Sequence, residues 1–230
     1  MVSGGNSGSI VGNTEEFTTS VLATTAAAWA SGGALNTARN AMGGTGTQTA
    51  AIGFGGSPGS GYSGKTETYD GTSFTEVNDM STVRGYVGSA GTQTAALAIG
   101  GLGPERYAVV ESFNGTSWSE IADLNTVRSG TGGAGTTTAA VAFGGNPGSS
   151  PYFSVDTEEY NGSSWSEQNN LSTGRVGVSG SGTQTVALAA GGEISTGASD
   201  ATEEYNGTSW SGGGSLLTAR YFMQTANQAP

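Results

Sequence analysis

Arginine recurs at nearly constant intervals along the chain, and this restricts the possible folds more than any other feature of the sequence. The intervals are 45, 44, 47 and 45 residues. The arginines concerned are Arg39, Arg84, Arg128, Arg175 and Arg220. A fixed period of roughly 20 to 50 residues is typical of solenoids, propellers and other arrays of one supersecondary unit. We therefore expect the chain to repeat a single structural unit.

Three further markers keep the same register as the arginines. An aromatic residue stands ten residues before each arginine, at Trp29, Phe74, Trp118, Trp165 and Trp210. A Gly-Thr-Gln-Thr tetrad, or its Gly-Thr-Thr-Thr variant, begins at Gly46, Gly91, Gly135 and Gly182. A glycine pair follows each tetrad, at 55/56, 100/101, 144/145 and 191/192. Four markers in one register are a much stronger signal than any single short motif.

The repeat also explains a composition that would otherwise favour disorder. Glycine accounts for 42 of the 230 residues, and large aliphatic residues are sparse, which is typical of low-complexity chains. Within the repeat, however, glycine pairs end strands and Asn-Gly pairs make hairpins. Small residues suit a strand that lies close to a central axis. The high glycine content and the low aliphatic content are therefore properties of the repeated unit and do not indicate disorder.

Each unit is expected to form four short antiparallel strands. The small residues after the arginine suit an inner strand, and the alternation over 94–99 predicts the next one. In that strand Leu97 and Ile99 share one face, while Ala96 and Ala98 share the other. A bulky face can therefore nest against the shallow face of a neighbouring copy. An acidic strand and an aromatic strand follow, and the Asn-Gly between them predicts a type I′ turn.

The order of these markers resembles the kelch repeat: arginine, small-residue strand, apolar strand ending in Gly-Gly, variable loop, acidic strand with tyrosine, hairpin, then tryptophan. The resemblance covers essentially the whole chain, although the hairpin is shorter and more uniform than in most kelch repeats. Four antiparallel strands at this period fit the blade of a β-propeller. The Gly-, Thr- and Asn-rich copies also look like repeats in structural proteins, such as tail or adhesion proteins, of marine bacteriophages and metagenomes.

Counting units predicts an all-β fold: a five-bladed β-propeller of four-stranded antiparallel blades, forming a single domain over 1–230. Four blades are continuous, at about 39–83, 84–127, 128–174 and 175–219. The fifth is split and combines 220–230 with 1–38. Pairing the N- and C-terminal strands in one blade closes the ring and removes an exposed sheet edge. The segment from Phe17 to Trp29 is longer than its counterparts, which indicates either a longer outer hairpin or an apolar protrusion that contacts a partner.

Binding residues are better sought where the copies differ, because a position present in every copy is needed for packing. The copies differ most between the glycine pair and the acidic strand, in loops that emerge on one face of a propeller. A rigid scaffold that presents variable loops with aromatic and polar side chains is typical of a recognition surface; the alternative is drift in tolerant surface loops. The residues singled out for ligand binding are Tyr62, Lys65, Glu105, Arg106, Tyr107, Tyr152, Phe153 and Asp156.

The repeated arginines allow two interpretations. Five guanidinium groups around one mouth of the central channel would form an anion trap. Alternatively, each arginine ties its blade to the next through carbonyl groups or through acidic pairs such as Glu158 and Glu159. The second interpretation is favoured, because every blade carries the residue.

Several kinds of function are disfavoured by residues that the chain lacks. It has no cysteine and no histidine, which removes thiolate catalysis and most zinc, copper and iron sites. A net charge of −11 argues against binding to nucleic acid or to an anionic membrane. No apolar run is long enough to cross a bilayer, and no signal-peptide pattern is visible, so no membrane insertion is expected. No cofactor or metal is expected, although loop aspartates leave calcium binding open.

These observations favour a non-enzymatic protein. Paired glutamates alternate across a strand and do not converge on a substrate as the two carboxylates of a glycosidase must. The leading hypothesis is a virion-surface or extracellular adhesion module that recognises a host-surface glycan or protein through its variable loops. The first alternative is a purely architectural module that binds sister proteins in a larger assembly. A weaker alternative is a carbohydrate-active enzyme.

Overall fold

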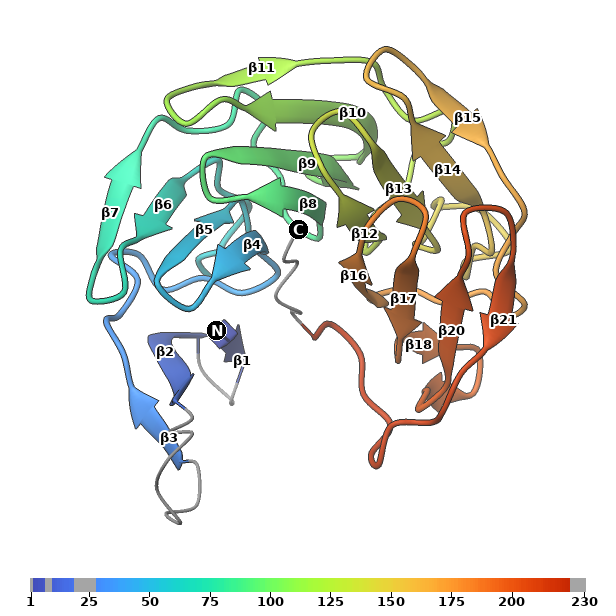
Figure 1. Ribbon diagram of the computed structural model, residues 1–230. Helices are drawn as coiled ribbons and strands as arrows, with labels where there is room; N and C mark the ends of the chain where they lie inside the picture. Colours follow the sequence, from blue (N-terminus) through green and yellow to red (C-terminus); the bar gives the residue numbers. More distant parts are fainter. Residues whose placement is uncertain (1, 7–9, 19–27, 224–230) are drawn as a thin grey trace.

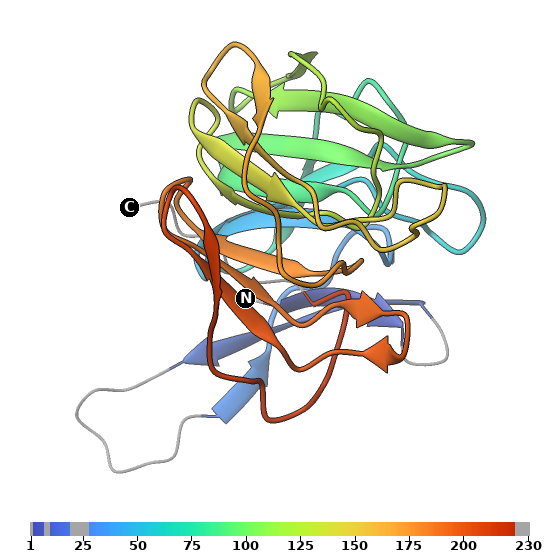
Figure 2. The same cartoon turned by 90° about the vertical axis from the view of Figure 1, so that its right-hand side faces the viewer.

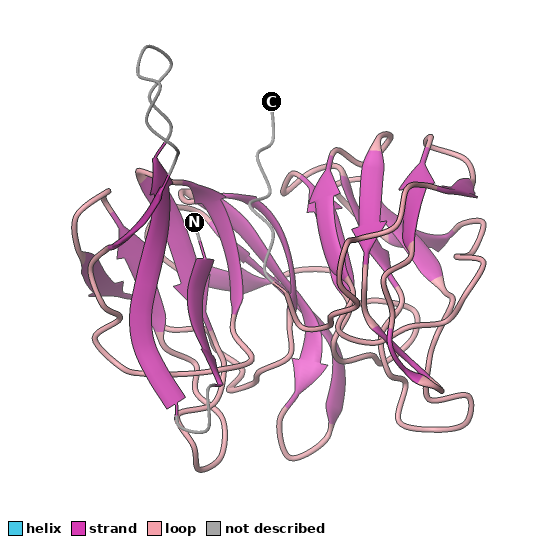
Figure 3. Cartoon of the chain, turned by 90° about the horizontal axis from the view of Figure 1, so that it is seen from below, coloured by secondary structure: helices cyan, strands magenta, loops and turns pink. Residues whose placement is uncertain are grey.

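The protein folds entirely into β-strands and connecting loops over the residues that its computed structural model describes (Figures 1 and 3). These residues are 2–6, 10–18 and 28–223, with only the backbone described up to residue 30. Most strands belong to four-stranded antiparallel sheets. The predicted all-β fold with repeated four-stranded sheets is therefore confirmed.

Four sheets are simple meanders whose strands pair in the order of the sequence. The first contains β4 (Gly43–Thr47), β5 (Ala50–Phe54), β6 (Thr66–Tyr69) and β7 (Phe74–Val77). The second contains β8 (Gly88–Thr92), β9 (Ala95–Leu102), β10 (Arg106–Phe113) and β11 (Trp118–Glu120). The third contains β12 (Gly132–Gly135), β13 (Ala140–Phe143), β14 (Thr157–Tyr160) and β15 (Trp165–Glu167). The fourth contains β16 (Ser179–Gly182), β17 (Ala187–Ala190), β20 (Thr202–Tyr205) and β21 (Trp210–Gly212).

Two smaller sheets complete the described chain. A three-stranded sheet near the N-terminus contains β1 (Val2–Asn6), β2 (Ile10–Thr18) and β3 (Ala28–Ser31). A two-stranded hairpin of β18 (Glu193–Ile194) and β19 (Gly197–Ala198) lies within the loop that connects β17 to β20. The predicted pairing of the C-terminal strand with the N-terminal one falls on 224–230, outside the described residues. Most of the long segment between Phe17 and Trp29 also lies outside them.

The sheets are arranged around a common centre, with β4, β8, β12 and β16 innermost and β7, β11, β15 and β21 outermost (Figure 1). Neighbouring inner strands pack directly against each other. They approach so closely that a Cβ atom added to Gly180 would lie 2.3 Å from the carbonyl oxygen of Gly133. The small residues predicted for the inner strand are therefore required by the spacing of the backbones.

The faces of neighbouring sheets nest as the alternation of the sequence predicts. Leu97 and Ile99 on β9 pack in one buried cluster with Ala140 and Ala142 on β13 of the next sheet. Trp165 joins the same cluster, and its Nε1 donates a hydrogen bond to the carbonyl oxygen of Ala122 at 3.0 Å. Each core thus lies between two sheets, and the thin apolar content of the chain is concentrated there.

Four of the repeated arginines lie inside the protein and not around a channel mouth. Arg128 is fully buried; it donates hydrogen bonds to the carbonyl oxygens of Gly144 and Asp156 and forms an ion pair with Glu158 at 2.6 Å. The other carboxylate oxygen of Glu158 accepts the backbone N–H of Asn125 at 2.7 Å. Equivalent ion pairs join Arg39 to Glu67, Arg84 to Glu111 and Arg175 to Glu203. This geometry excludes an anion trap built from these four guanidinium groups.

The prediction of a type I′ turn is wrong. Such a turn needs positive φ at both of its central residues. In the turn after Tyr160, Gly162 has a φ of 92°, whereas Asn161 is not among the described non-glycine residues with positive φ. The Asn161 side chain instead accepts the backbone N–H groups of Ser163 and Ser164 at 2.9 and 3.0 Å. A four-residue loop closed by an asparagine side chain replaces the two-residue turn.

Candidate functional site

A ring of backbone hydrogen bonds, open between its first and last members, runs around the centre of the molecule on the side of the variable loops. Its members stand two positions after the repeated arginines: Ala41, Tyr86, Gly130, Gly177 and Phe222. From Tyr86 onward, each N–H donates a hydrogen bond to the carbonyl oxygen of the previous member. The donor–acceptor distances of these four bonds are 2.7 to 2.8 Å. All five residues have φ between 52° and 66°. The non-glycine residues among them carry backbone strain that tertiary contacts must offset.

Two members of this ring place aromatic side chains over the centre. The rings of Tyr86 and Phe222 meet edge to face, with their centroids 5.2 Å apart. Gly177 makes room for them, because a Cβ atom there would lie 2.7 Å from the ring of Phe222. The ring of Tyr221 lies 5.5 Å from that of Phe222. Tyr221 and Phe222 remain 47% and 43% exposed, so these rings form an accessible aromatic surface.

Tyr62 extends this surface from the neighbouring loop. Its ring lies over Gly85, where an added Cβ atom would be 3.2 Å from Cδ1 of Tyr62. Burial raises the pKa of the Tyr62 hydroxyl above its ordinary value, Tyr86 adds to the shift, and Arg106 opposes it. The hydroxyl is therefore a neutral hydrogen-bond donor at physiological pH. We call Tyr62, Tyr86, Tyr221 and Phe222 the aromatic platform.

Arg106 pairs with Leu102, which bridges to Gly85 under the Tyr62 ring, so that Arg106 stands on the strand beside this platform. An added Cβ atom at Gly148 would lie 3.1 Å from Nη1 and 3.2 Å from Cδ of Arg106, so its side chain covers that glycine. The Nε atom of Arg106 is buried and has no hydrogen-bond partner. Among the described residues, Arg106 belongs to none of the ion pairs. The half-buried guanidinium group of Arg106 thus has no carboxylate partner among the described residues.

The predicted loop between the second glycine pair and the acidic strand is largely a β-hairpin. Strand β9 continues to Leu102, and β10 begins at Arg106, so that only 103–105 connect them. Arg106 and Tyr107 are consequently strand residues, while Glu105 is exposed at the tip of the hairpin. The Tyr107 ring packs over Gly103. Figure 2 shows this hairpin and the β18–β19 hairpin projecting on the same side of the molecule.

None of the ring pairs, ion pairs and hydrogen bonds of the described residues links the other predicted binding residues to the aromatic platform. Lys65 forms a surface ion pair with Glu76 on β7 at 2.5 Å. Asp156 offers its carbonyl oxygen to Arg128, and its N–H donates to Ser154 Oγ at 2.9 Å. Tyr152 is 55% exposed and Phe153 half-buried on the loop that follows Gly148. The structure thus brings together Tyr62 and Arg106 of the eight predicted residues.

The platform residues Tyr86, Tyr221 and Phe222 were missed because they stand in stretches assigned to inner strands. Aligning the five units shows the available signal, since Tyr86 and Phe222 occupy a position that is otherwise glycine or alanine. A bulky aromatic residue at a position reserved for small ones indicates a special role. The left-handed backbone conformation of Tyr86 and Phe222, however, is visible only in the structure.

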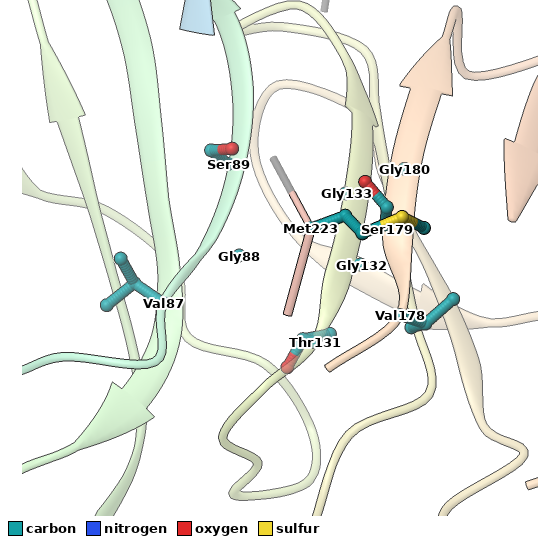
Figure 4. A pocket seen from close by; sticks show the side chains of 10 residues that line it. All are labelled: Val87, Gly88, Ser89, Thr131, Gly132, Gly133, Val178, Ser179, Gly180 and Met223. Carbon is teal, nitrogen blue, oxygen red and sulfur yellow. The ribbon is translucent and has the colours of Figure 1, made fainter. Parts of the chain in front are cut away.

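A polar cavity of about 30 Å³ lies among β8, β12 and β16 (Figure 4). Its lining residues are Val87, Gly88, Ser89, Thr131, Gly132, Gly133, Val178, Ser179, Gly180 and Met223. This volume suits a water molecule.

Metal and membrane features were also sought in the described part of the chain. No group of three or more acidic side chains that could hold a metal ion occurs there. No helix long and apolar enough to span a membrane occurs in the same ranges. Comparison of the sequence with models of known protein families gives no match, and a search of curated proteins gives none either.

Proposed function

We propose that the chain forms a five-bladed β-propeller in which β1, β2 and β3 belong to the fifth blade. The register of these strands supports this: Val2 pairs with Glu15 as Ala98 pairs with Glu111 in the second sheet. Five left-handed residues in the hydrogen-bonded ring match five units, and a bond from Ala41 N–H to the Phe222 carbonyl would close it. By the same register, closure of the ring would bring Arg220 to Glu15, as Arg84 is paired with Glu111.

The exposed face of the fourth sheet supports the same arrangement. Leu188 on β17 is 37% exposed, whereas its counterparts Ile52, Leu97 and Val141 are at most 2% exposed. A groove of about 470 Å³, lined by Val186, Leu188 and Tyr205 among others, lies over this face. In a closed ring the N-terminal sheet covers this face, as each following sheet covers the one before it.

We further propose that the protein is a non-enzymatic recognition module, on a virion or outside the cell, that binds a host-surface glycan. The observation that carries this proposal is the aromatic platform, with Arg106 at its side. Tyrosine and phenylalanine rings offer flat apolar surface to the C–H faces of a sugar at little cost in side-chain entropy, and tyrosine hydroxyls suit its hydroxyl groups. The rigid ring of sheets holds these side chains in place before a ligand binds.

A glycan array probed with the intact domain tests this proposal. We expect binding to a restricted set of glycans, and at least about tenfold weaker binding by Tyr221→Ala and by Tyr86→Gly, because hot spots are commonly aromatic. Glycine at position 86 tolerates the left-handed backbone, so the fold is retained.

Two comparisons make the array decisive. Ser163→Ala, on an exposed residue of the turn between β14 and β15, should bind as the wild type does. Tyr107→Ala, Tyr152→Ala and Phe153→Ala test whether the surface extends over the outer loops. Wild-type binding by both platform variants would contradict the placement of the site. Absence of binding to every glycan would instead favour the architectural module.

A further inference from the structure

The positive charges of the protein are almost all engaged, which makes Arg106 unusual. The chain has seven Lys and Arg residues against eighteen Asp and Glu. Four arginines are buried in ion pairs with glutamates, and Lys65 is paired with Glu76. Arg220 is exposed, and its Nε donates to the carbonyl oxygen of Thr218. Arg106 and Arg220 thus both stand outside the ion pairs of the described residues, and Arg106 is the half-buried one of the two.

The side chain of Arg106 is held in position before any ligand binds. Arg106 is the first residue of β10, and its pairing with Leu102 fixes the backbone there. Its Cδ and Nη1 atoms lie against Gly148, which belongs to the next unit and has a φ of 84° that favours glycine. The buried Nε has no protein acceptor. The buried Nε atoms of Arg39 and Arg128 likewise have none, so the atoms of Arg106 left for a ligand are its two Nη atoms.

We propose that Arg106 binds the carboxylate of an acidic sugar residue whose ring stacks on the aromatic platform. The planar guanidinium group can donate two parallel hydrogen bonds to a carboxylate through its two Nη atoms. The neutral Tyr62 hydroxyl is a further donor beside it. This inference rests on the proposed glycan recognition and narrows it to sugars that carry a carboxylate.

The overall charge restricts the ligand to an isolated carboxylate within an otherwise neutral glycan. Polyanions such as nucleic acids or densely sulfated polymers are bound by clusters of Lys and Arg. Here a net charge of −11 repels them, and the local attraction comes from isolated arginines such as Arg106 and not from a cluster of cations. Discrimination between ligands therefore depends on the paired hydrogen-bond donors of the Arg106 guanidinium group and on stacking of the sugar ring on the aromatic platform.

The test compares each acidic sugar with its own methyl ester, which keeps the ring and removes the charge. The probes are oligosaccharides ending in N-acetylneuraminic acid or glucuronic acid, titrated calorimetrically into the intact domain. We expect the acid to bind at least about tenfold more tightly than the ester. Arg106→Gln should abolish this preference, and Arg106→Lys should restore only part of it, because lysine lacks the planar fork.

Lys65→Gln is the matched control, since it removes the same charge from a residue that is already paired with Glu76. It should keep the preference for the acid. Equal binding of acid and ester by the wild type, or an unchanged preference in Arg106→Gln, would overturn the inference. Binding of neutral glycans only would leave the proposed glycan recognition intact and reject the carboxylate. Preference for an acidic peptide over every acidic glycan would reject both.

Discussion

Replacing Arg128 with methionine is expected to lower the free energy of unfolding by about 3 to 5 kcal/mol. The substitution leaves Glu158 buried without its cationic partner and removes donors from the carbonyl oxygens of Gly144 and Asp156. Uncompensated burial of a carboxylate is the largest of these costs. Urea unfolding followed by tryptophan fluorescence measures the loss.

Two companion variants separate the ion pair from general effects of substitution. Lys65→Met removes the cation of the surface pair with Glu76 and should change the stability very little, because that pair is exposed to solvent. The double variant Arg128→Met with Glu158→Met removes the stranded carboxylate and should recover part of the loss. Equal effects of Arg128→Met and Lys65→Met would contradict the structural role assigned to the repeated arginines.

The second large effect is expected at the inner strands, where Gly180→Val should destabilise the fold by about 3 kcal/mol or more. A Cβ atom at this position would lie 2.3 Å from the oxygen and 2.7 Å from the nitrogen of Gly133. Both atoms belong to the backbone of β12, so the two inner strands must move apart. Thermal unfolding monitored by circular dichroism measures the effect.

Gly212→Val on the outer strand β21 is the matched control. No atom lies within 4 Å of a Cβ added there, and its stability should stay within about 0.5 kcal/mol of the wild type. A similar loss at both positions would mean that the inner strands have no special need for glycine. Ser89 occupies the position equivalent to Gly180 in the second sheet, where its hydroxyl donates to the Gly44 carbonyl at 2.9 Å. Gly180→Ser should therefore cost less than Gly180→Val.

The repeated sheets were predictable from the sequence because their signals recur in register. Glycine pairs, alternating apolar residues and the arginine with its glutamate each reflect a contact made in several units. The turn after Tyr160 was not predictable in the same way. Asn-Gly fits a type I′ turn, but the asparagine side chain competes for the backbone N–H groups and stabilises a longer loop.

The candidate site was predictable only in part, since it combines repeated and unrepeated features. Tyr62 and Arg106 departed from the repeat and were found by that departure. Tyr86 and Phe222 lie at a position defined by the repeat, and their role comes from left-handed backbone and from contact across the centre. Contact between residues 136 positions apart cannot be inferred from local pattern. The strand character of Arg106 was missed because the hairpin of β9 and β10 has no counterpart of equal length.

Closure of the ring by the two ends of the chain is the central structural claim, and a designed disulfide tests it most directly. In the four complete sheets the residue five positions after the arginine pairs with the residue two positions before the glycine pair, as Gly180 does with Ala189. Val2 and Thr225 are the corresponding residues of the fifth unit. Directly opposed residues lie within the reach of a disulfide. The chain has no cysteine of its own that could compete with a designed pair.

Oxidation of the Val2→Cys, Thr225→Cys variant, followed by mass spectrometry of its peptides, should therefore give an intramolecular disulfide in nearly every molecule. The control Val2→Cys, Ala226→Cys should form it much less readily, because adjacent residues of a strand point to opposite faces. Free thiols, intermolecular disulfides alone, or equal yields from the two variants would contradict closure by the chain ends.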